Sequence, residues 1–309
     1  MQCNRAPVLA CLLCLCGAAA SVCAQQMITD PLLPENAAQQ VSPHVYVIMG
    51  FPNIGIIVGE KATLVIDTGL GARNGSVAAR TASALSTRQQ RLYLTTTHYH
   101  PEHASGVGGF PAGTLVIRPK VQQAELEADG ARMIALFAAR SPQMSELLKG
   151  AELEAADMAF ERELDLDLGG VHARLLYFGP AHTKGDELVF VPEDSVLLPG
   201  DVVQDKLSPN VSCASCSPRQ WITVLDQVAP LAPKHIVPDH GALGGGELIA
   251  QERDFLVTLQ SRAAALKAQG KSAADAGTLI AGELARRYPG WQALRNVPQA
   301  VQRAYDDHP

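Results

Sequence analysis

Four side chains that can bind a metal lie within seven positions in the stretch Thr97-His98-Tyr99-His100-Pro101-Glu102-His103. The apolar run Leu92-Tyr93-Leu94 and the threonines at 95–97 stand immediately before these histidines and predict a buried strand. The histidines begin where the apolar run stops. We therefore expect them to lie at the end of a strand, where several side chains can converge.

A first metal can be bound by three imidazoles. His98 and His100 come from this stretch, and His182 stands alone further along the chain. Three histidines occupy most of a tetrahedral zinc shell at roughly 2.0–2.1 Å and leave the last position for water, which is typical of a catalytic zinc. We assign these three histidines to the first metal.

A second metal can be bound by His103, His240 and a carboxylate. Asp201 lies between His182 and His240 in the sequence and can place one oxygen on each metal across a gap of about 3.5–4 Å. The pattern therefore predicts a two-metal hydrolytic centre.

The pattern resembles that of the metallo-β-lactamase superfamily, whose defining run HxHxDH is followed by a distant His, a bridging Asp and a final His. The matching pieces appear in family order: Leu64-Val-Ile-Asp-Thr-Gly69, Thr97 to His103, Gly179-Pro-Ala-His-Thr-Lys-Gly-Asp186, Pro199-Gly-Asp201 and Pro238-Asp-His-Gly241. The resemblance implies an α/β protein with the four-layer αβ/βα sandwich of this superfamily. It also implies a metal-dependent hydrolase with the metal ligands His98, His100, His182, Glu102, His103, Asp201 and His240.

Glu102 departs from the family, which usually has Asp there. Its extra methylene carries the carboxylate past the usual position unless another rotamer is used. Two interpretations follow: Glu102 binds the second metal, or it orients and deprotonates the water on a single zinc. We favour the ligand interpretation because Asp201 is present. Glu102 and Asp201 are also the candidates to protonate the leaving group.

Further side chains are expected around the ligands. Asp67 is predicted to fix a ligand imidazole or its loop, and Thr183 and Asp186 flank His182. Lys184 is either a contact for a substrate carboxylate or a solvated lysine. Tyr99 and Asn53 are expected to face the substrate cleft.

Composition limits the class of protein. The chain has 309 residues, 47% hydrophobic and 18% charged, which is typical of one fairly large globular domain. The net charge of −6 and the absence of a Lys/Arg run argue against nucleic acid and favour a small-molecule substrate.

Residues 1–24 have the pattern of a signal peptide. Arg5 supplies the positive charge, residues 8–20 are apolar or small, and Val22-Cys23-Ala24 is suited to cleavage. A lipoprotein site at Cys11 would leave almost no hydrophobic region before it. We therefore expect a periplasmic or secreted protein that starts at Gln25 and has no membrane anchor.

Two cysteines, Cys213 and Cys216, remain after that cleavage. A CxxC pair in an exported protein usually oxidises, so we expect a local disulfide that shapes the loop after Asp201. A redox pair and a soft-metal site are the alternatives, but a structural zinc would need further ligands that are absent.

The remaining sequence predicts strands alternating with helices. Residues 25–270 are expected to form the catalytic domain, with a helical insertion around 120–153 and a helical C-terminal segment at 271–309. The insertion either covers a sheet or, through Met133, Phe137 and Met144, forms a wall of the cleft. The predicted strands are 45–49, 54–58, 63–67, 92–97, 114–118, 162–168, 172–178, 188–191, 196–198 and 235–237, and the predicted helices are 74–86, 220–231 and 246–269.

Zinc, with two ions, is the expected cofactor, although the same ligands also suit iron and manganese. Zinc makes hydroxide available at neutral pH, so we predict hydrolysis of an ester, thioester, lactone or amide-type bond. Asp201 resembles the thioester, lactone and sulfatase branches of the superfamily. A class B β-lactamase is the alternative, and a non-catalytic metal-binding module is the hypothesis from another class. The sequence has no flavin-binding domain after the motifs, which argues against an oxygen-using iron centre.

Overall fold

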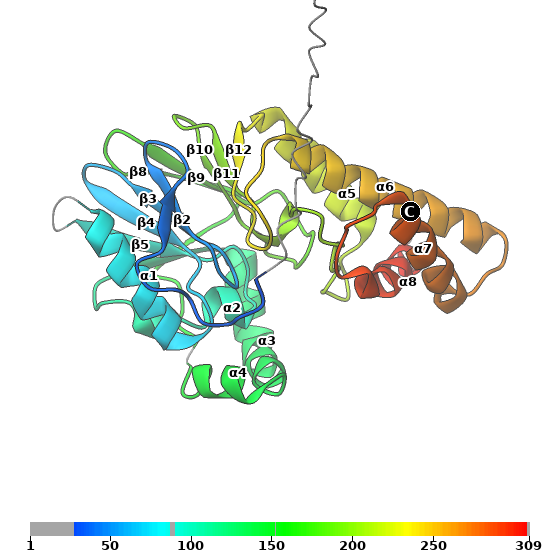
Figure 1. The fold of residues 1–309 in the computed structure, drawn as a ribbon, viewed down its shortest axis with the longest axis horizontal. Coiled ribbons are helices and arrows are strands. Elements are labelled where there is room, and N and C mark those ends of the chain that lie inside the picture. Colours follow the sequence, from blue (N-terminus) through cyan, green and yellow to red (C-terminus); the bar gives the residue numbers. More distant parts are fainter. Residues whose placement is uncertain (1–27, 87–89, 152, 308–309) are drawn as a thin grey trace, which may run out of the picture.

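The computed structural model of the chain describes residues 28–86, 90–151 and 153–307. Two β-sheets pack face to face, and helices cover their outer faces (Figure 1). This architecture confirms the predicted αβ/βα sandwich. The predicted signal peptide, residues 1–24, lies outside the described residues.

The first sheet has the strand order β1-β2-β3-β4-β5-β6-β7. Neighbouring strands from β1 to β4 run antiparallel, whereas β4 to β7 pair in parallel. The strands are β1 (Ala38–Gln40), β2 (Val45–Ile48), β3 (Ile54–Val58), β4 (Ala62–Ile66), β5 (Arg91–Thr95), β6 (Leu115–Pro119) and β7 (Met158–Phe160). The short strands β1 and β7 were not predicted, because each has only three residues and no apolar alternation.

The second sheet has the order β12-β11-β10-β9-β8 and is antiparallel except for the parallel pair β11 and β12. Its strands are β8 (Glu163–Asp167), β9 (His172–Leu176), β10 (Leu188–Val191), β11 (Val196–Leu198) and β12 (His235–Ile236). Alternation along the strands builds the core between the sheets. Ile57 of β3 packs in one cluster with Leu175 and Val189 of the second sheet, while its neighbour Ile56 faces the other side.

Helices cover the two outer faces. Helix α1 (Gly71–Leu85) packs Val77, Ala78 and Ala82 on the first sheet. Helices α5 (Pro218–Val228) and α6 (Glu247–Ala268) cover the second sheet, with Trp221 and Phe255 buried in the same cluster as Leu197 of β11. Burial of such large side chains stabilises each layer by roughly 1.5–3 kcal/mol per side chain.

The predicted insertion contains helices α3 (Lys120–Ala138) and α4 (Pro142–Leu147). Ser141 caps the N-terminus of α4, because its Oγ accepts a hydrogen bond from Met144 N at 3.1 Å. Both helices contribute to a small cluster around Phe137 that also contains Tyr99 from the loop after β5. These contacts hold the insertion beside the loop of residues 97–103.

The C-terminal segment packs on the second sheet's helices. Helices α7 (Ala273–Arg287) and α8 (Val297–Asp306) contact α6 and extend beyond the sandwich (Figure 1). The 3₁₀ turn η4 (Leu294–Asn296) stands between them in the chain and contacts both. Ile280, Leu284 and Val301 belong to the same hydrophobic cluster as Phe255. Within the described ranges, no helix has the length and apolar character needed to cross a membrane.

Four loops meet at one edge of the sandwich. Strands β4 and β5 are parallel neighbours, so the loops that follow them leave the sheet side by side, and the same holds for β11 and β12. Ligands bind at the carboxyl ends of parallel strands in such sheets. Asp67, the 97–103 stretch, Asp201 and His240 all follow these strands.

Candidate metal centre

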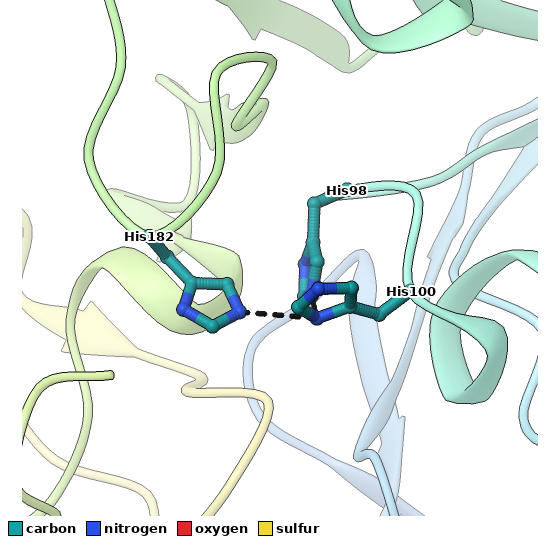
Figure 2. Close-up of side chains that lie close together, drawn as sticks. All are labelled: His98, His100 and His182. Carbon is teal, nitrogen blue, oxygen red and sulfur yellow. Dashed lines mark hydrogen bonds between the residues drawn. The ribbon is translucent and has the colours of Figure 1, made fainter. Parts of the chain in front are cut away.

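The first group of converging side chains is formed by His98, His100 and His182 (Figure 2). Nδ1 of His100 lies 3.0 Å from Nε2 of His98 and 3.2 Å from Nε2 of His182. Burial, followed by the charges of neighbouring histidines, lowers the pKa of His98 and His100 well below the usual range. Both imidazoles are therefore neutral, which is the form that binds metals.

The second group is formed by Glu102, His103 and His240. Glu102 and His103 lie in the short helix α2 (Pro101–Ala104), and all three side chains are buried. Oε1 of Glu102 lies 3.9 Å from Nε2 of His103. Burial raises the pKa of the Glu102 carboxyl to about 7, because a buried carboxylate without a partner is unfavourable. A bound cation would stabilise the charged carboxylate and lower this pKa.

Asp201 lies between the two groups. Its Oδ2 is 3.4 Å from Nε2 of His182, and its Oδ1 is 3.5 Å from Nε2 of His240. Gly200 allows this position, because its φ is +61° and a Cβ there would approach Cβ of Thr97 to 2.7 Å. The predicted bridging residue thus has one oxygen directed to each group.

The donor atoms fit metal ions. Among the described residues, Nε2 of His103, Oε2 of Glu102 and Oδ1 of Asp201 are buried and have no hydrogen-bond partner. Buried polar atoms are nearly always paired, so three partnerless atoms in one place need a further partner. Imidazole and carboxylate donors are the set that a catalytic zinc uses.

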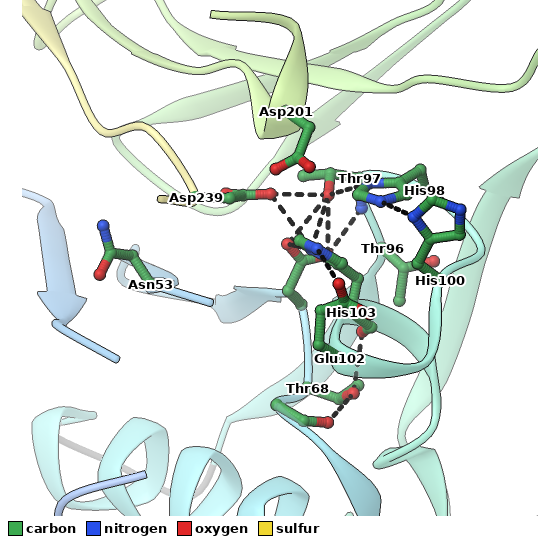
Figure 3. Close-up of polar contacts among 12 residues, drawn as sticks. Asn53, Thr68, Thr96, Thr97, His98, His100, Glu102, His103, Asp201 and Asp239 are labelled. Atoms are coloured by element: carbon green, nitrogen blue, oxygen red, sulfur yellow. Dashed lines mark hydrogen bonds and ion pairs between the residues drawn. The ribbon is translucent and has the colours of Figure 1, made fainter. Parts of the chain in front are cut away.

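A buried carboxylate network holds His103. Oδ2 of Asp67 lies 2.9 Å from Nδ1 of His103. Oδ2 of Asp239 lies 3.3 Å from the same nitrogen (Figure 3). Oγ1 of Thr97 lies 2.8 Å from Oδ2 of Asp239. Burial alone would lower the pKa of His103, but Asp67 and Asp239 outweigh it and raise the pKa. Burial and then the charge of Asp67 raise the pKa of Asp239 to about 8.

Asp239 is a site residue that sequence reasoning missed. It stands beside His240 in the quoted piece Pro238-Asp-His-Gly241, and this adjacency was its only signal. Asp67, by contrast, contacts the imidazole of a candidate ligand, His103, as expected. Its φ of +68° is a left-handed conformation that Asp tolerates better than most residues, at the turn where β4 ends.

The loop of residues 210–216 supports His182. Nδ1 of His182 donates to the carbonyl oxygen of Asn210, while Ser212 donates to the His182 carbonyl from N at 3.0 Å and from Oγ at 2.7 Å. The disulfide between Cys213 and Cys216 follows immediately, and this pairing confirms the prediction of a local bridge. The bridge therefore constrains a loop that touches a candidate metal ligand.

Asp186 fixes the same histidine loop from the other side. Its Oδ2 accepts from N of Ala181 at 3.1 Å and from N of Thr183 at 2.9 Å. Neither Thr183 nor Asp186 touches the His182 imidazole through these hydrogen bonds, so they act on the backbone that carries it. Lys184 is exposed and is not part of the cleft lining, so its side chain is a solvated one.

A cleft of about 700 Å³ opens over both groups. Met133 and Phe137 of α3 line it together with Tyr99, whereas Met144 does not. The insertion is therefore a wall of this cleft through two of the three predicted side chains. Unpredicted lining residues come from the hairpin after β2, from the insertion and from the C-terminal segment, namely Phe51, Arg140, Arg295 and Asn296.

The expectation that Asn53 faces the cleft is wrong. Its side chain is buried, with Nδ2 donating to the Pro238 carbonyl at 2.7 Å and Oδ1 accepting from N of Gly50 at 2.9 Å. An amide has both donors and acceptors, and here they tie the hairpin to the loop of His240. Asn53 thus positions the loop that carries the candidate ligand His240.

Comparisons with known proteins identify the family of the chain. The sequence model of the Metallo-beta-lactamase superfamily matches residues 47–240, more than half of the chain. A curated relative, the Metallo-beta-lactamase type 2 of Bacteroides fragilis, is 25% identical over 114 residues. That match covers 36% of this chain and 46% of the relative, so the chain spans about half the length of the curated relative.

Solved structures share the fold. The stereoselective inverting sec-alkylsulfatase Pisa1 from Pseudomonas sp. is 18% identical with a TM-score of 0.68, over 87% of this chain and 50% of that one. A metallo-beta-lactamase from Pontibacter korlensis is also 18% identical, with a TM-score of 0.56 over 73% of this chain and 99% of that one. The chain belongs to the metallo-β-lactamase superfamily, whose members are metal-dependent hydrolases.

Proposed function

We propose that the protein is an exported zinc-dependent hydrolase that cleaves an ester, thioester, lactone or amide-type bond, sulfate esters included. The observation that carries this proposal is the position of Asp201, with one oxygen directed to each of two groups of buried donors. Such an arrangement is that of a two-metal hydrolytic site.

We divide the candidate ligands between two metal ions. His98, His100 and His182 would hold one zinc. Glu102, His103 and His240 would hold a second, with Asp201 shared between them. The closeness of Glu102 to His103 and His240 favours its ligand role over that of an outer base.

Zinc bound here would lower the pKa of water from about 15.7 to near 7 and polarise the bond to be cleaved. The chain's own residues do the rest. Asp201 and Glu102 line the cleft, where a carboxylate oxygen can take the proton of water and return it to the leaving group. His103 is held in one orientation by Asp67 and Asp239, so the site is organised before a substrate enters.

A class B β-lactamase is the second candidate. It is favoured by the sequence match to the Bacteroides fragilis enzyme. Asp201 argues against it, because this bridging carboxylate is typical of other branches of the superfamily. Export is supported by the predicted signal peptide and by the Cys213–Cys216 disulfide, since disulfides persist in oxidising compartments.

The test compares two chromogenic substrates, 4-nitrophenyl butanoate and a cephalosporin, with zinc-loaded protein and with a chelator. We expect chelator-sensitive hydrolysis of the ester, and a kcat/KM of about 10⁴ M⁻¹s⁻¹ or more on the cephalosporin would favour the β-lactamase. His182→Ala should abolish turnover, whereas His44→Ala, away from the cleft, should not. A zinc-loaded protein that hydrolyses neither these substrates nor a thioester, lactone or sulfate ester would favour a non-catalytic module.

A further inference from the structure

We propose that Arg140 and Arg295 form an anion-binding clamp at the metal cleft and select a substrate that carries a carboxylate or sulfate group together with an apolar chain. The proposal deepens the proposed hydrolase function and, as a statement about substrate class, rests on it. The clamp itself is a binding site that can be tested without turnover.

Both arginines line the cleft that contains His100, Glu102 and Asp201. They come from parts of the chain that lie far apart in sequence. Arg140 follows the end of α3 in the insertion, and Arg295 lies in η4 of the C-terminal segment. Two separate additions to the sandwich therefore each bring a guanidinium to the same opening.

Neither arginine forms a salt bridge within the part of the chain that the structure describes. Among the described residues, no Asp or Glu oxygen lies within 4.0 Å of the Arg140 or Arg295 guanidinium. Arg132 lines the same cleft and shows the contrast, because it donates from Nε and Nη2 to Asp129 at 2.6 Å each. A free guanidinium presents the fork of donors that matches a carboxylate or sulfate.

The two positive charges also act on each other. Burial lowers the pKa of Arg140, Glu102 opposes this shift, and the charge of Arg295 lowers the pKa further. Two like charges at one opening repel each other, and an anion between them removes that repulsion. This electrostatic arrangement favours binding of an anion over a neutral group.

Arg140 is held in place by an aromatic ring. Its guanidinium carbon lies 3.3 Å from the ring centroid of Phe137, which in turn lies 6.3 Å from the ring of His100. Stacking on Phe137 orients the guanidinium without using its hydrogen-bond donors. The donors therefore stay available close to the first metal group.

The same cleft offers apolar surface. Met133 and Phe137 line it, and Leu136 beside them is 48% exposed, one of few large hydrophobic side chains so exposed in the described chain. Phe51 also lines the cleft, with its ring centroid 5.0 Å from that of His240. An anion with an apolar chain would use both features.

The first test compares matched esters. Wild-type protein should hydrolyse 4-nitrophenyl hemisuccinate with a kcat/KM about tenfold or more above that for 4-nitrophenyl butanoate, because charge-assisted hydrogen bonds to both arginines favour the anion. Arg140→Met and Arg295→Met should each remove most of this preference through KM, with little change for the neutral ester. Arg140→Lys should restore part of it. Arg132→Met is the matched control and should keep the preference.

Equal losses on both esters would show that Arg140 acts only on structure, and equal rates in the wild type would overturn the clamp. A third arm with 4-nitrophenyl sulfate distinguishes the sources of the anion. Loss of sulfate-ester hydrolysis in the arginine variants places the reacting group itself in the clamp, whereas loss confined to the hemisuccinate places a separate carboxylate there.

A second test needs no turnover and separates failure of the clamp from failure of the proposed hydrolase. Calorimetric titration of metal-free protein with 4-phenylbutanoate and with 4-phenylbutan-1-ol should show at least tenfold tighter binding of the anion. The Arg140→Met/Arg295→Met double variant, checked for unchanged melting temperature, should lose this difference. Binding of neither compound, or equal binding of both by the wild type, would overturn the proposal even if the protein hydrolyses esters.

Discussion

Oδ2 of Asp67 lies 2.9 Å from Nδ1 of His103, and both side chains are completely buried. This contact uses one nitrogen of the imidazole and leaves Nε2 directed to Glu102 and His240. A carboxylate behind a ligand histidine fixes the ring and makes the ligand more basic. The second metal group is thus organised from behind by a residue at the end of β4.

Asp67→Asn should weaken the second zinc without removing the first. Asn keeps the shape of Asp and tolerates the φ of +68°, so the fold should persist. Loss of the carboxylate behind His103 should reduce zinc affinity at that group by about 10- to 100-fold. Zinc competition titration measures this, with Asp194→Asn as control because Asp194 also contacts a histidine ring, that of His44, and its partners Ser42 and His44 do not line the cleft. Two zinc ions bound at wild-type affinity would exclude this role.

Glu102→Gln should also lower affinity for the second zinc, because an amide lacks the charge that balances the cation. Glu102→Asp restores the residue usual in the family and should keep two zinc ions. The same titration, together with ester hydrolysis, separates the two roles of Glu102. If Glu102→Gln binds two zinc ions normally and loses only turnover, the carboxylate is a base and not a ligand.

Gly200→Ala should lower the free energy of unfolding by more than the cost of its left-handed φ alone. A left-handed φ costs a non-glycine residue roughly 1–2 kcal/mol, and the new Cβ would also meet Thr97 at 2.7 Å. Gly270 is the control, because it has a φ of +75° and nothing within 4 Å of its added Cβ. Urea unfolding should show a larger loss for Gly200→Ala, accompanied by weaker zinc binding. Equal losses would mean that Thr97 moves freely.

Glu252→Gln should stabilise the metal-free protein more at pH 8 than at pH 5. Glu252 on α6 is 1% exposed, and burial, followed in the same direction by the charge of Asp201, raises its pKa well above the usual range. The protonated Glu252 side chain contributes fully to the stability of the folded state below the unfolded-state pKa of about 4.3. This contribution is lost as the pH rises towards the folded-state pKa. Gln does not titrate and avoids this loss.

Urea unfolding at the two pH values tests the sign of this effect. The exposed Glu247 on the same helix provides the control Glu247→Gln, which should shift stability little at either pH. A Glu252→Gln difference that is independent of pH would contradict the raised pKa.

Much of the site could be predicted because its signals are local. His98, His100 and Glu102 follow a strand within a few residues, and apolar runs fix the strands that carry Asp67 and Asp201. Tertiary contacts were harder to predict. Asn53 was placed wrongly because an amide on a hairpin tip can turn either way, and only the fold brings Pro238 to it. Arg295 gave no signal, because sequence alone does not reveal which surface η4 reaches.

The number of zinc ions bound per chain tests the central claim most directly. Metal analysis of the purified protein after zinc loading and dialysis should give two zinc ions per chain. His240→Ala should bind one zinc ion, held by His98, His100 and His182. One zinc ion in the wild type would contradict the two-metal centre and would favour Glu102 as a base. The absence of bound zinc would contradict the assignment of zinc as the metal.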